Sequence, residues 1–404
     1  MIALLLAQTI AITGGTVYPV SGPKLANASV LIRDGRIVAV GTNVPIPPDA
    51  TRIDAAGKWV TPGLIDGAGQ LGLVEISAVA GTRDASVQGD TIAASFNVAE
   101  GINPASTVIP VTRIEGITTA LAVPTGNLVS GQAVLIDLDG ATIEQMLVKS
   151  PVGVVADLSE SAKDAAGGSR AAVAERLRGV FRDALEYERR KADFSRAQMR
   201  ALSASARDLD ALLPVLHGRV ALIAYVNRRS DIETALRLAK EFNLKLILAG
   251  AAEGWEIAAA IAAAGVPVLV EPLSNIPGYD ALGIRYGNAG IMAKAGVKVA
   301  LLEPDTHKSR NLRQQAGNAV SYGMTWDQAL RAVTLSPAEI FGVADRYGSL
   351  EPGKVANVVV WSGDPFEYHR GRARVHSGAG DPAREPADGA VREVQETATA
   401  ILDG

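Results

Sequence analysis

The distribution of apolar residues divides the chain into a β-rich beginning, a long alternating region and a β-rich return. Residues 9–60 contain apolar runs rich in Val and Ile, and Asp34-Gly35 separates two of them, which predicts a two-residue hairpin turn. From about residue 59 to residue 341, short apolar strands alternate with helical patterns. This alternation predicts a parallel sheet with helical crossovers.

Several helices in the alternating region can be placed from their spacing and their capping residues. Apolar residues recur at helical spacing over residues 231–242, with Ser230 as the expected N-cap. Two capping boxes, which begin at Thr325 and Ser336, predict two further helix starts. Residues 169–206 are rich in Ala, Arg and Glu and predict one or two exposed helices.

The β pattern returns at residues 348–361, which predicts that the two ends of the chain meet in a small second domain. Residues 367–404 are rich in Arg, Ala, Gly, Pro and Glu, and no strand pattern is visible there. This composition predicts an irregular tail, either native or the product of a frameshift.

Composition excludes several classes of partner and site. The net charge of −4 gives no electrostatic basis for binding nucleic acid or an anionic membrane. The chain has no cysteine, which excludes disulfides, thiolate metal ligands and a cysteine nucleophile. No apolar run is long enough to span a membrane. Residues 1–8 are similar to the end of a secretory signal peptide, so we expect a periplasmic or exported protein, with a cytoplasmic location as the alternative.

The segment TPGLIDGAGQLGL, residues 61–73, has the form of an active-site loop. An apolar approach predicts a buried strand, and Asp66 follows at its end. The next positions at which a side chain would face a ligand hold Ala68 and Gln70. The loop therefore has the frame of a catalytic loop but little of its chemistry.

This segment and GSLEPGKVANVVVWSGDPFE, residues 348–367, resemble the amidohydrolase superfamily, in particular its imidazolonepropionase and prolidase-like branch. The resemblance implies an α/β fold, a (β/α)8 TIM-like barrel with a small composite β-sandwich domain from both chain ends. It also implies zinc-dependent hydrolysis of C–N bonds at the C-terminal ends of the barrel strands. The implied parts are a signal-peptide remnant at 1–8, a β-sandwich of 9–61 plus 343–366, a barrel at 62–342 and a tail at 367–404.

The resemblance further implies four metal-binding histidines, and this chain has other residues at those positions. Asp305 matches the aspartate that ends the family's eighth strand. The chain has only four histidines, and only His307 follows a strand near the expected site. We therefore expect no metal ligands and no cofactor, although the family uses zinc. The four histidine positions hold Ala68, Gln70, Tyr225 and Gly250.

Three polar residues near the expected barrel mouth each allow two interpretations. Asp66 lies behind a metal site, or it caps backbone N–H groups. Gln70 contacts a ligand or fills the space that a metal ligand would occupy. Tyr225 donates a hydrogen bond to a ligand or packs across the mouth.

Residues after the last two predicted barrel strands allow two interpretations as well. Asp305 and His307 form an acid–base pair, or they are a structural aspartate beside a surface histidine. Glu271 joins Asp305 in a weak site for a hard cation, or it forms a salt bridge with an arginine such as Arg285 or Arg310.

Two functions are consistent with these residues. The chain is either a C–N hydrolase of altered design, acting on peptide-like or cyclic amides, or a non-catalytic protein with a degenerate site. A non-catalytic protein would bind a small molecule at the barrel mouth or serve as a structural subunit. We expect a homo-oligomer, or a hetero-oligomer with an active related amidohydrolase. The fold alone cannot decide between these functions, because function depends on the site.

Overall fold

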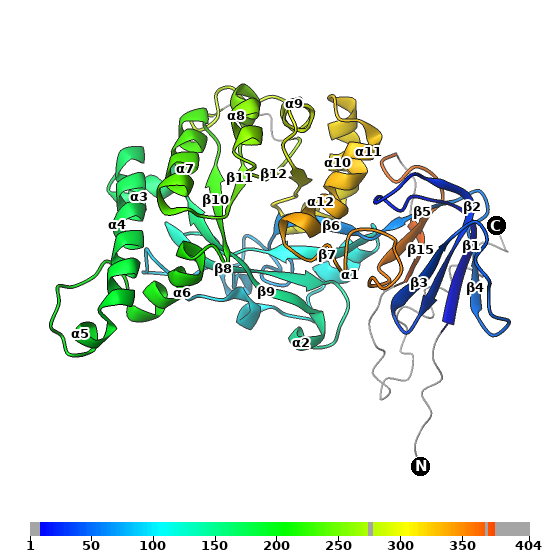
Figure 1. Ribbon diagram of the computed structural model, residues 1–404, viewed down its shortest axis with the longest axis horizontal. Helices are drawn as coiled ribbons and strands as arrows, with labels where there is room; N and C mark the ends of the chain where they lie inside the picture. Colours follow the sequence, from blue (N-terminus) through cyan, green and yellow to red (C-terminus); the bar gives the residue numbers. More distant parts are fainter. Residues whose placement is uncertain (1–8, 274–277, 368–370, 376–404) are drawn as a thin grey trace, which may run out of the picture.

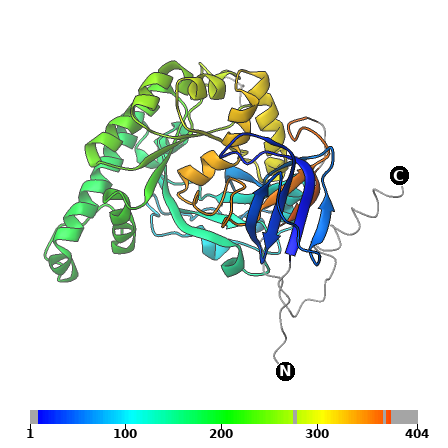
Figure 2. The same ribbon diagram turned by 45° about the vertical axis from the view of Figure 1, so that its right-hand side comes forward.

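The computed structural model describes residues 9–273, 278–367 and 371–375. A barrel-like sheet is covered by helices, and a second sheet lies at its side (Figure 1). Figure 2 shows the second sheet in front of one end of the barrel, with strands from both ends of the chain. None of the helices in the described part of the chain is long and apolar enough to cross a membrane.

The larger sheet has eight strands in the order β13-β12-β11-β10-β9-β8-β7-β6. The two edge strands, β13 and β6, lie close together. The Glu303 N–H, just after β13, donates to the Asp66 carboxylate on β6 at 3.1 Å. A Cβ atom on Gly67 would lie 2.6 Å from the Leu301 carbonyl oxygen, so only glycine fits at this seam. The TIM-like barrel expected from the sequence is confirmed in this nearly closed form. The strands are β6 (Leu64–Gly69), β7 (Ile117–Ala122), β8 (Val129–Asp137), β9 (Leu147–Asp157), β10 (Ala221–Val226), β11 (Leu246–Gly250), β12 (Val268–Val270) and β13 (Val299–Leu301).

One strand of the barrel runs against the others. β8 pairs antiparallel with both β7 and β9, whereas the remaining neighbours are parallel. The loop between Ala122 and Val129 is too short for the crossover that a parallel pair requires. The prediction of an entirely parallel sheet is therefore wrong at β8, because an apolar run does not reveal the direction of its strand.

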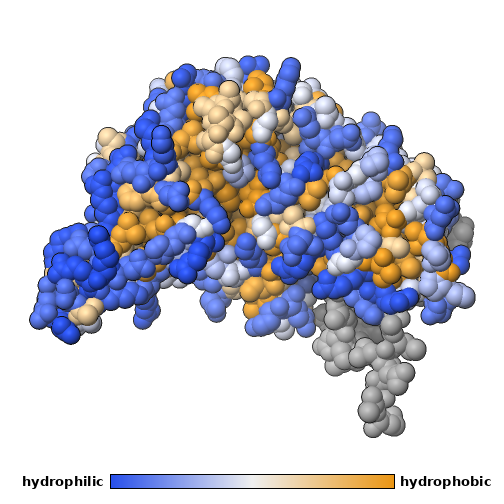
Figure 3. All heavy atoms as spheres, viewed as in Figure 1, coloured by the Kyte–Doolittle hydropathy of each residue, from blue (hydrophilic) through white to orange (hydrophobic). Residues whose placement is uncertain are grey.

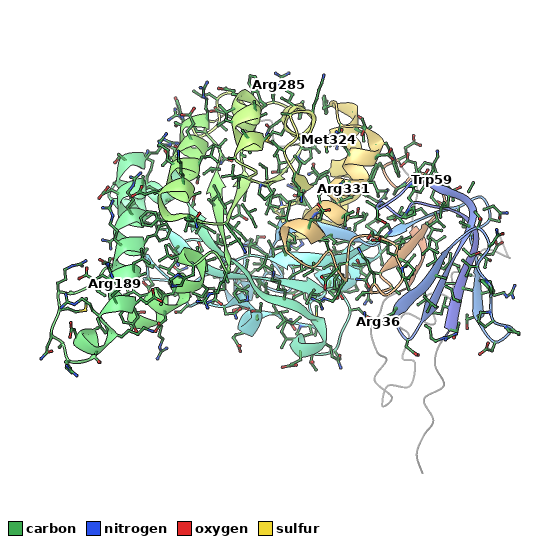
Figure 4. All side chains as sticks on the ribbon, in the orientation of Figure 1. Arg36, Trp59, Arg189, Arg285, Met324 and Arg331 are labelled. Carbon is green, nitrogen blue, oxygen red and sulfur yellow. The ribbon has the colours of Figure 1, made fainter. Side chains whose placement is uncertain are left out.

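Helices cover the outside of the barrel, and an arm formed by α4, α5 and the following loop projects from it (Figure 1). Figure 3 shows mostly hydrophilic residues over this arm, and Arg189 lies at the end of α4 in Figure 4. The α-helices are α1 (Val108–Arg113), α2 (Ile143–Met146), α3 (Lys163–Ala166), α4 (Arg170–Arg189), α5 (Lys191–Ser195), α6 (Ala206–Leu216), α7 (Arg229–Phe242), α8 (Ala258–Ala263), α9 (Asn288–Lys294), α10 (Leu312–Ser321), α11 (Trp326–Ala332) and α12 (Leu335–Ile340). The 3-10 helices are η1 (Ala80–Thr82), η2 (Val98–Gly101), η3 (Glu160–Ala162), η4 (Gly254–Ile257) and η5 (Thr306–Asn311).

Capping chemistry predicts some helix starts and not others. The capping box at Thr325 is confirmed at the start of α11. The prediction of Ser336 as an N-cap is wrong, because α12 follows α11 after only a short connection and begins at Leu335, with Thr334 at the N-cap position. The prediction of Ser230 as N-cap is also wrong. The Glu253 carboxylate, from another segment, accepts the Arg229 N–H at 2.8 Å and so replaces a local cap.

The smaller sheet combines strands from both chain ends in the order β15-β14-β5-β1-β2-β3, with β4 paired to β1. The hairpin predicted at Asp34-Gly35 is confirmed between β2 and β3, and both turn residues have positive φ. The strands are β1 (Thr9–Val17), β2 (Leu25–Arg33), β3 (Arg36–Gly41), β4 (Thr51–Asp54), β5 (Trp59–Pro62), β14 (Val358–Trp361) and β15 (Gly371–Val375).

The segment after Phe366 was expected to be irregular, and this prediction is wrong for β15. This strand pairs antiparallel with β14 at the edge of the smaller sheet. An edge strand needs backbone partners on one side only, so its sequence need not contain an apolar run. Residues 376–404 and the signal-like residues 1–8 lie outside the described residues.

Aromatic and charged contacts attach the smaller sheet and the returning chain to the barrel. Trp59, labelled in Figure 4, packs on Tyr18 and Trp326 with ring centroids 4.9 and 5.4 Å apart. The Trp326 indole N–H donates to the Asp364 carboxylate at 3.0 Å. Buried Arg313 donates to the carbonyl oxygens of Pro365 and Glu367 and pairs with a glutamate before β7. These contacts hold the C-terminal return in place.

Candidate functional site

The barrel interior is filled by apolar side chains. One buried cluster takes residues from all eight barrel strands, and Ala68 on β6 belongs to it. Tyr225 on β10 packs against the same cluster. Both residues stand where the resemblance implies histidine ligands, and both therefore contribute to packing of the interior.

Gln70 follows β6 directly and turns toward the next loop. Its side-chain amide donates to the Thr125 hydroxyl at 3.2 Å. Thr125 lies in the loop after β7, so this contact joins the first two loops at the barrel mouth. A side chain held in this way orients the loops and presents its carbonyl oxygen as the remaining acceptor.

Gly250 ends β11 in a conformation that does not accept a side chain. Its φ is +85°, and a Cβ atom would lie 2.7 Å from the Asn227 Oδ1 atom and 2.9 Å from the Val226 carbonyl oxygen. A histidine at this position would therefore require the backbone to move.

The residues present do not fit the zinc centre that the fold family implies. Zinc in proteins is held by imidazole, thiolate or carboxylate groups, usually three or four of them. Ala68 and Gly250 supply no donor atom. Within residues 9–273, 278–367 and 371–375, no three His, Cys, Asp or Glu side chains lie together in a way that could hold a metal ion.

A buried pair of carboxyl groups, Asp66 and Glu303, joins β6 to the segment after β13. Asp66 is fully buried, and its Oδ1 atom accepts the backbone N–H of Glu303 at 3.1 Å. Its Oδ2 atom makes no hydrogen bond of normal geometry to another described residue, although the Ser309 hydroxyl lies near the carboxylate and opposes the rise of its pKa. Glu303 is also buried and accepts a hydrogen bond from the Gln315 amide of α10 at 2.7 Å.

This environment changes the acidity of both carboxyl groups. Burial, with a further contribution from the neighbouring Glu303 charge, raises the pKa of Asp66 to about 8. Burial also raises the pKa of Glu303 above its ordinary value, although the Gln315 hydrogen bond opposes the shift. Asp66 therefore holds a proton near neutral pH.

Sequence reasoning missed Glu303 and Gln315. The position of Glu303 shortly after the apolar run of β13 indicates a residue at the barrel mouth. The residue selected from the sequence was Asp305 instead, because Asp305 matches the family pattern. Gln315 lies on a helix and reaches the pair only through the packing of α10 against the barrel. No local pattern could have found it.

Tyr225 and Glu271 are two further titratable groups near the pair, and the charges of Lys308 and Asp305 also act on Glu303. Burial raises the pKa of Tyr225, and the charges of Asp157 and Asp66 add to this shift. Burial likewise raises the pKa of Glu271, and the Glu303 charge adds to it. Arg285, considered as a salt-bridge partner for Glu271, lies over the Trp255 ring at 4.7 Å.

Asp305 and His307 are placed differently from an acid–base pair. Asp305 is the N-cap of η5: its carboxylate accepts the backbone N–H of His307 at 3.0 Å and lies 3.4 Å from the Lys308 ammonium. The His307 ring lines a separate cavity beside α1. The Asp305 carboxylate therefore contacts the backbone N–H of His307, and no hydrogen bond to the His307 ring is found among the described residues.

Comparisons with known proteins agree with the fold and with the sequence motifs. Residues 288–387 match the model of the Amidohydrolase family. The amidohydrolase tasK of Hapsidospora irregularis is 23% identical over 374 residues, which is 83% of this chain and 38% of that protein. Imidazolonepropionase of Pseudomonas putida is 35% identical over 117 residues, 26% of this chain and 27% of that enzyme. The chain thus matches well under two thirds of the length of these relatives.

A solved structure matches almost the whole chain. The amidohydrolase from Thermotoga maritima MSB8 is 27% identical, with a TM-score of 0.83, and the match covers 91% of this chain and 98% of that one. Together with the family match, this similarity shows that the chain belongs to the amidohydrolase superfamily.

Proposed function

We propose that this chain is a hydrolase of C–N bonds in peptide-like or cyclic amides whose chemistry does not depend on a histidine-bound metal centre. The observation that carries the proposal is the structure around three positions where the resemblance implies metal-binding histidines. Ala68 and Tyr225 pack in the apolar interior, and the backbone at Gly250 excludes a side chain. Metal-dependent turnover is therefore weak or absent.

Amide hydrolysis without a metal needs a group that protonates the leaving nitrogen and a group that activates water. Asp66 can supply the proton, because burial keeps its carboxyl group protonated near neutral pH. Glu271 is half-buried and can accept a proton from water. Tyr225 and Gln70 can donate hydrogen bonds that orient the amide. We assign these roles as parts of the proposal.

A purely non-catalytic role is less well supported. The matching family and the structural relative are amidohydrolases, and the buried carboxyl pair supplies proton-transfer groups that a binding protein does not need. Raised carboxyl pKa values at the ends of barrel strands are typical of catalytic groups, although structural networks also produce them.

The test is hydrolysis by the full chain of a panel of N-acyl amino acids, dipeptides and cyclic amides, with and without a chelator. We expect weak hydrolysis that the chelator leaves unchanged and that Asp66→Asn lowers by at least about tenfold. The matched control is Asp137→Asn, a buried carboxyl group bonded to Tyr347 and Asn357 away from these residues. Hydrolysis that requires added zinc would overturn the proposal.

A further inference from the structure

A second candidate site lies outside the barrel interior. A half-open cavity of about 370 Å³ lies between the loop after β6, α1 and η5. Its walls include Glu75 and Ile76 from the loop, Val111 and Thr112 from α1, and His307 and Arg310 from η5. A cavity of this size is within the range of small-molecule sites.

Two polar atoms of residues that line this cavity are buried without a hydrogen-bond partner in the described part of the chain. The Thr107 hydroxyl donates to Oε2 of the Glu75 carboxylate at 3.1 Å and so fixes its orientation. The other carboxylate oxygen, Oε1, is buried and has no hydrogen-bond partner among the described residues. The Thr112 hydroxyl, on a side chain that is 1% exposed, is likewise buried and unpartnered there. Native proteins rarely leave such groups unsatisfied.

The wall formed by η5 carries a guanidinium group that is available to bind a ligand. The side chains of Arg310 and His307 are exposed, and no ion pair or side-chain hydrogen bond joins either of them to another described residue. A guanidinium group binds a carboxylate through two parallel hydrogen bonds. This wall therefore favours a carboxylate over a neutral group.

The remaining surface of the cavity is apolar and accessible. The side chains of Ile76 and Val111 are 50% and 43% exposed, and both lie at the cavity. They offer contact to a compact apolar group. The cavity therefore combines a guanidinium group without an ion pair to another described residue, lining residues with unsatisfied polar atoms, and an apolar surface within a space suited to one small molecule.

We propose that this cavity binds an α-amino carboxylate, free or N-acylated, with a compact apolar side chain. Arg310 and His307 receive the carboxylate, Glu75 Oε1 accepts the N–H group, and Thr112 hydrogen-bonds the carboxylate or acyl oxygen. Ile76 and Val111 contact the apolar side chain. The site uses none of the residues assigned to hydrolysis, so it stands or falls independently of the proposed function.

Calorimetric titration of the full chain tests this site with four defined probes. L-leucine and N-acetyl-L-leucine carry both polar groups, L-leucinamide lacks the carboxylate, and 4-methylpentanoate lacks the N–H group. We expect at least one of the first two to bind, and both of the others to bind at least about tenfold more weakly. Preference for L-leucine identifies an ammonium ligand, and preference for the acetylated probe identifies an amide.

Variants link binding to the cavity. Arg310→Gln and Glu75→Gln are each expected to weaken binding by at least about tenfold. Arg176→Gln on α4, an exposed arginine without an ion pair to any described residue, is the matched control and should bind as the native chain does. The inference is overturned if neither leucine probe binds at about 10 mM, or if binding survives both cavity substitutions.

Discussion

At the scale of single residues, the positions where the resemblance implies metal ligands are described by their surroundings as well as by their residue types. Ala68 lies within a packed interior, and the carboxyl group nearest to it in sequence, Asp66, is fully buried. Burial also changes the charge state of this carboxyl group, which holds a proton near neutral pH.

Asp66 should make the stability of the protein depend on pH. Its pKa is about 8 in the folded chain against an ordinary value of 3.8, so folding takes up a proton between these values. Stability is therefore greatest below about pH 4 with respect to this group and decreases as the pH rises to about 8, by at most about 6 kcal/mol. Urea unfolding at pH 5 to 9 measures this slope.

Asp66→Asn should flatten that profile, because the amide cannot ionise. The variant is expected to be more stable than the native chain at pH 8 and less different from it at pH 5. An unchanged pH slope in the variant would show that Asp66 ionises normally in the folded chain. Glu303→Gln, which removes the neighbouring carboxyl group, should change the slope in the same direction but less.

The backbone at Gly250 should resist any side chain. Gly250→Ala is expected to destabilise the chain by at least about 2 kcal/mol, because the Cβ atom would meet Asn227 and Val226 and φ is positive. Gly265→Ala is the matched control, since Gly265 has a φ of +64° and nothing within 4 Å of a Cβ. Equal losses in urea unfolding would show that the close approach at Gly250 has no cost.

At the scale of elements, groups distant in sequence decide where helices begin. α7 starts at Arg229 because the Glu253 carboxylate accepts its N–H, and the other carboxylate oxygen accepts the Gly283 N–H at 2.8 Å. One side chain thus caps a helix and holds the loop before α9. Local capping patterns in the sequence cannot predict a helix cap that comes from a distant segment.

Glu253→Ala should therefore weaken two elements together. We expect a loss of about 1–2 kcal/mol in the free energy of unfolding, with faster amide exchange at the start of α7 and in the loop at Gly283. The control is Glu233→Ala, which removes only an exposed pair with Arg229 and should cost about 0.5 kcal/mol or less. Faster exchange at α7 alone would contradict the dual role.

At the scale of the whole molecule, the returning C-terminal segment is fastened to the barrel by a buried arginine. Arg313→Met should cost about 3–5 kcal/mol, because it removes the ion pair with Glu115 and the hydrogen bonds to the Pro365 and Glu367 carbonyl oxygens. Amide exchange at β14 should accelerate with it.

The matched control for this clamp is Arg331→Met. Arg331, labelled in Figure 4, pairs with Glu339 at a more exposed position. Its substitution should therefore lower the free energy of unfolding by about 1 kcal/mol or less. A similar loss for the two arginines, or unchanged exchange at β14, would show that Arg313 does not fasten the return.

Periodicity and turn chemistry predicted the barrel strands, the hairpin at Asp34-Gly35 and the helix start at Thr325, because these signals are local. The direction of β8 was not predictable in this way, since it depends on which neighbours the strand pairs with. Residues of the candidate site could be predicted only at positions that match a motif of the family, such as Asp66 and Asp305. The pairing of Asp66 with Glu303 arises from closure of the barrel, which brings together residues far apart in sequence.

The central claim is that the barrel interior does not hold a zinc ion on histidine ligands, and bound metal per chain tests it most directly. The full chain is equilibrated with excess zinc, passed through a desalting column and analysed for metal by mass spectrometry. We predict zinc well below one ion per chain, unchanged in Asp66→Asn and Tyr225→Phe. One tightly held zinc ion per chain, lost in either variant, would contradict the account.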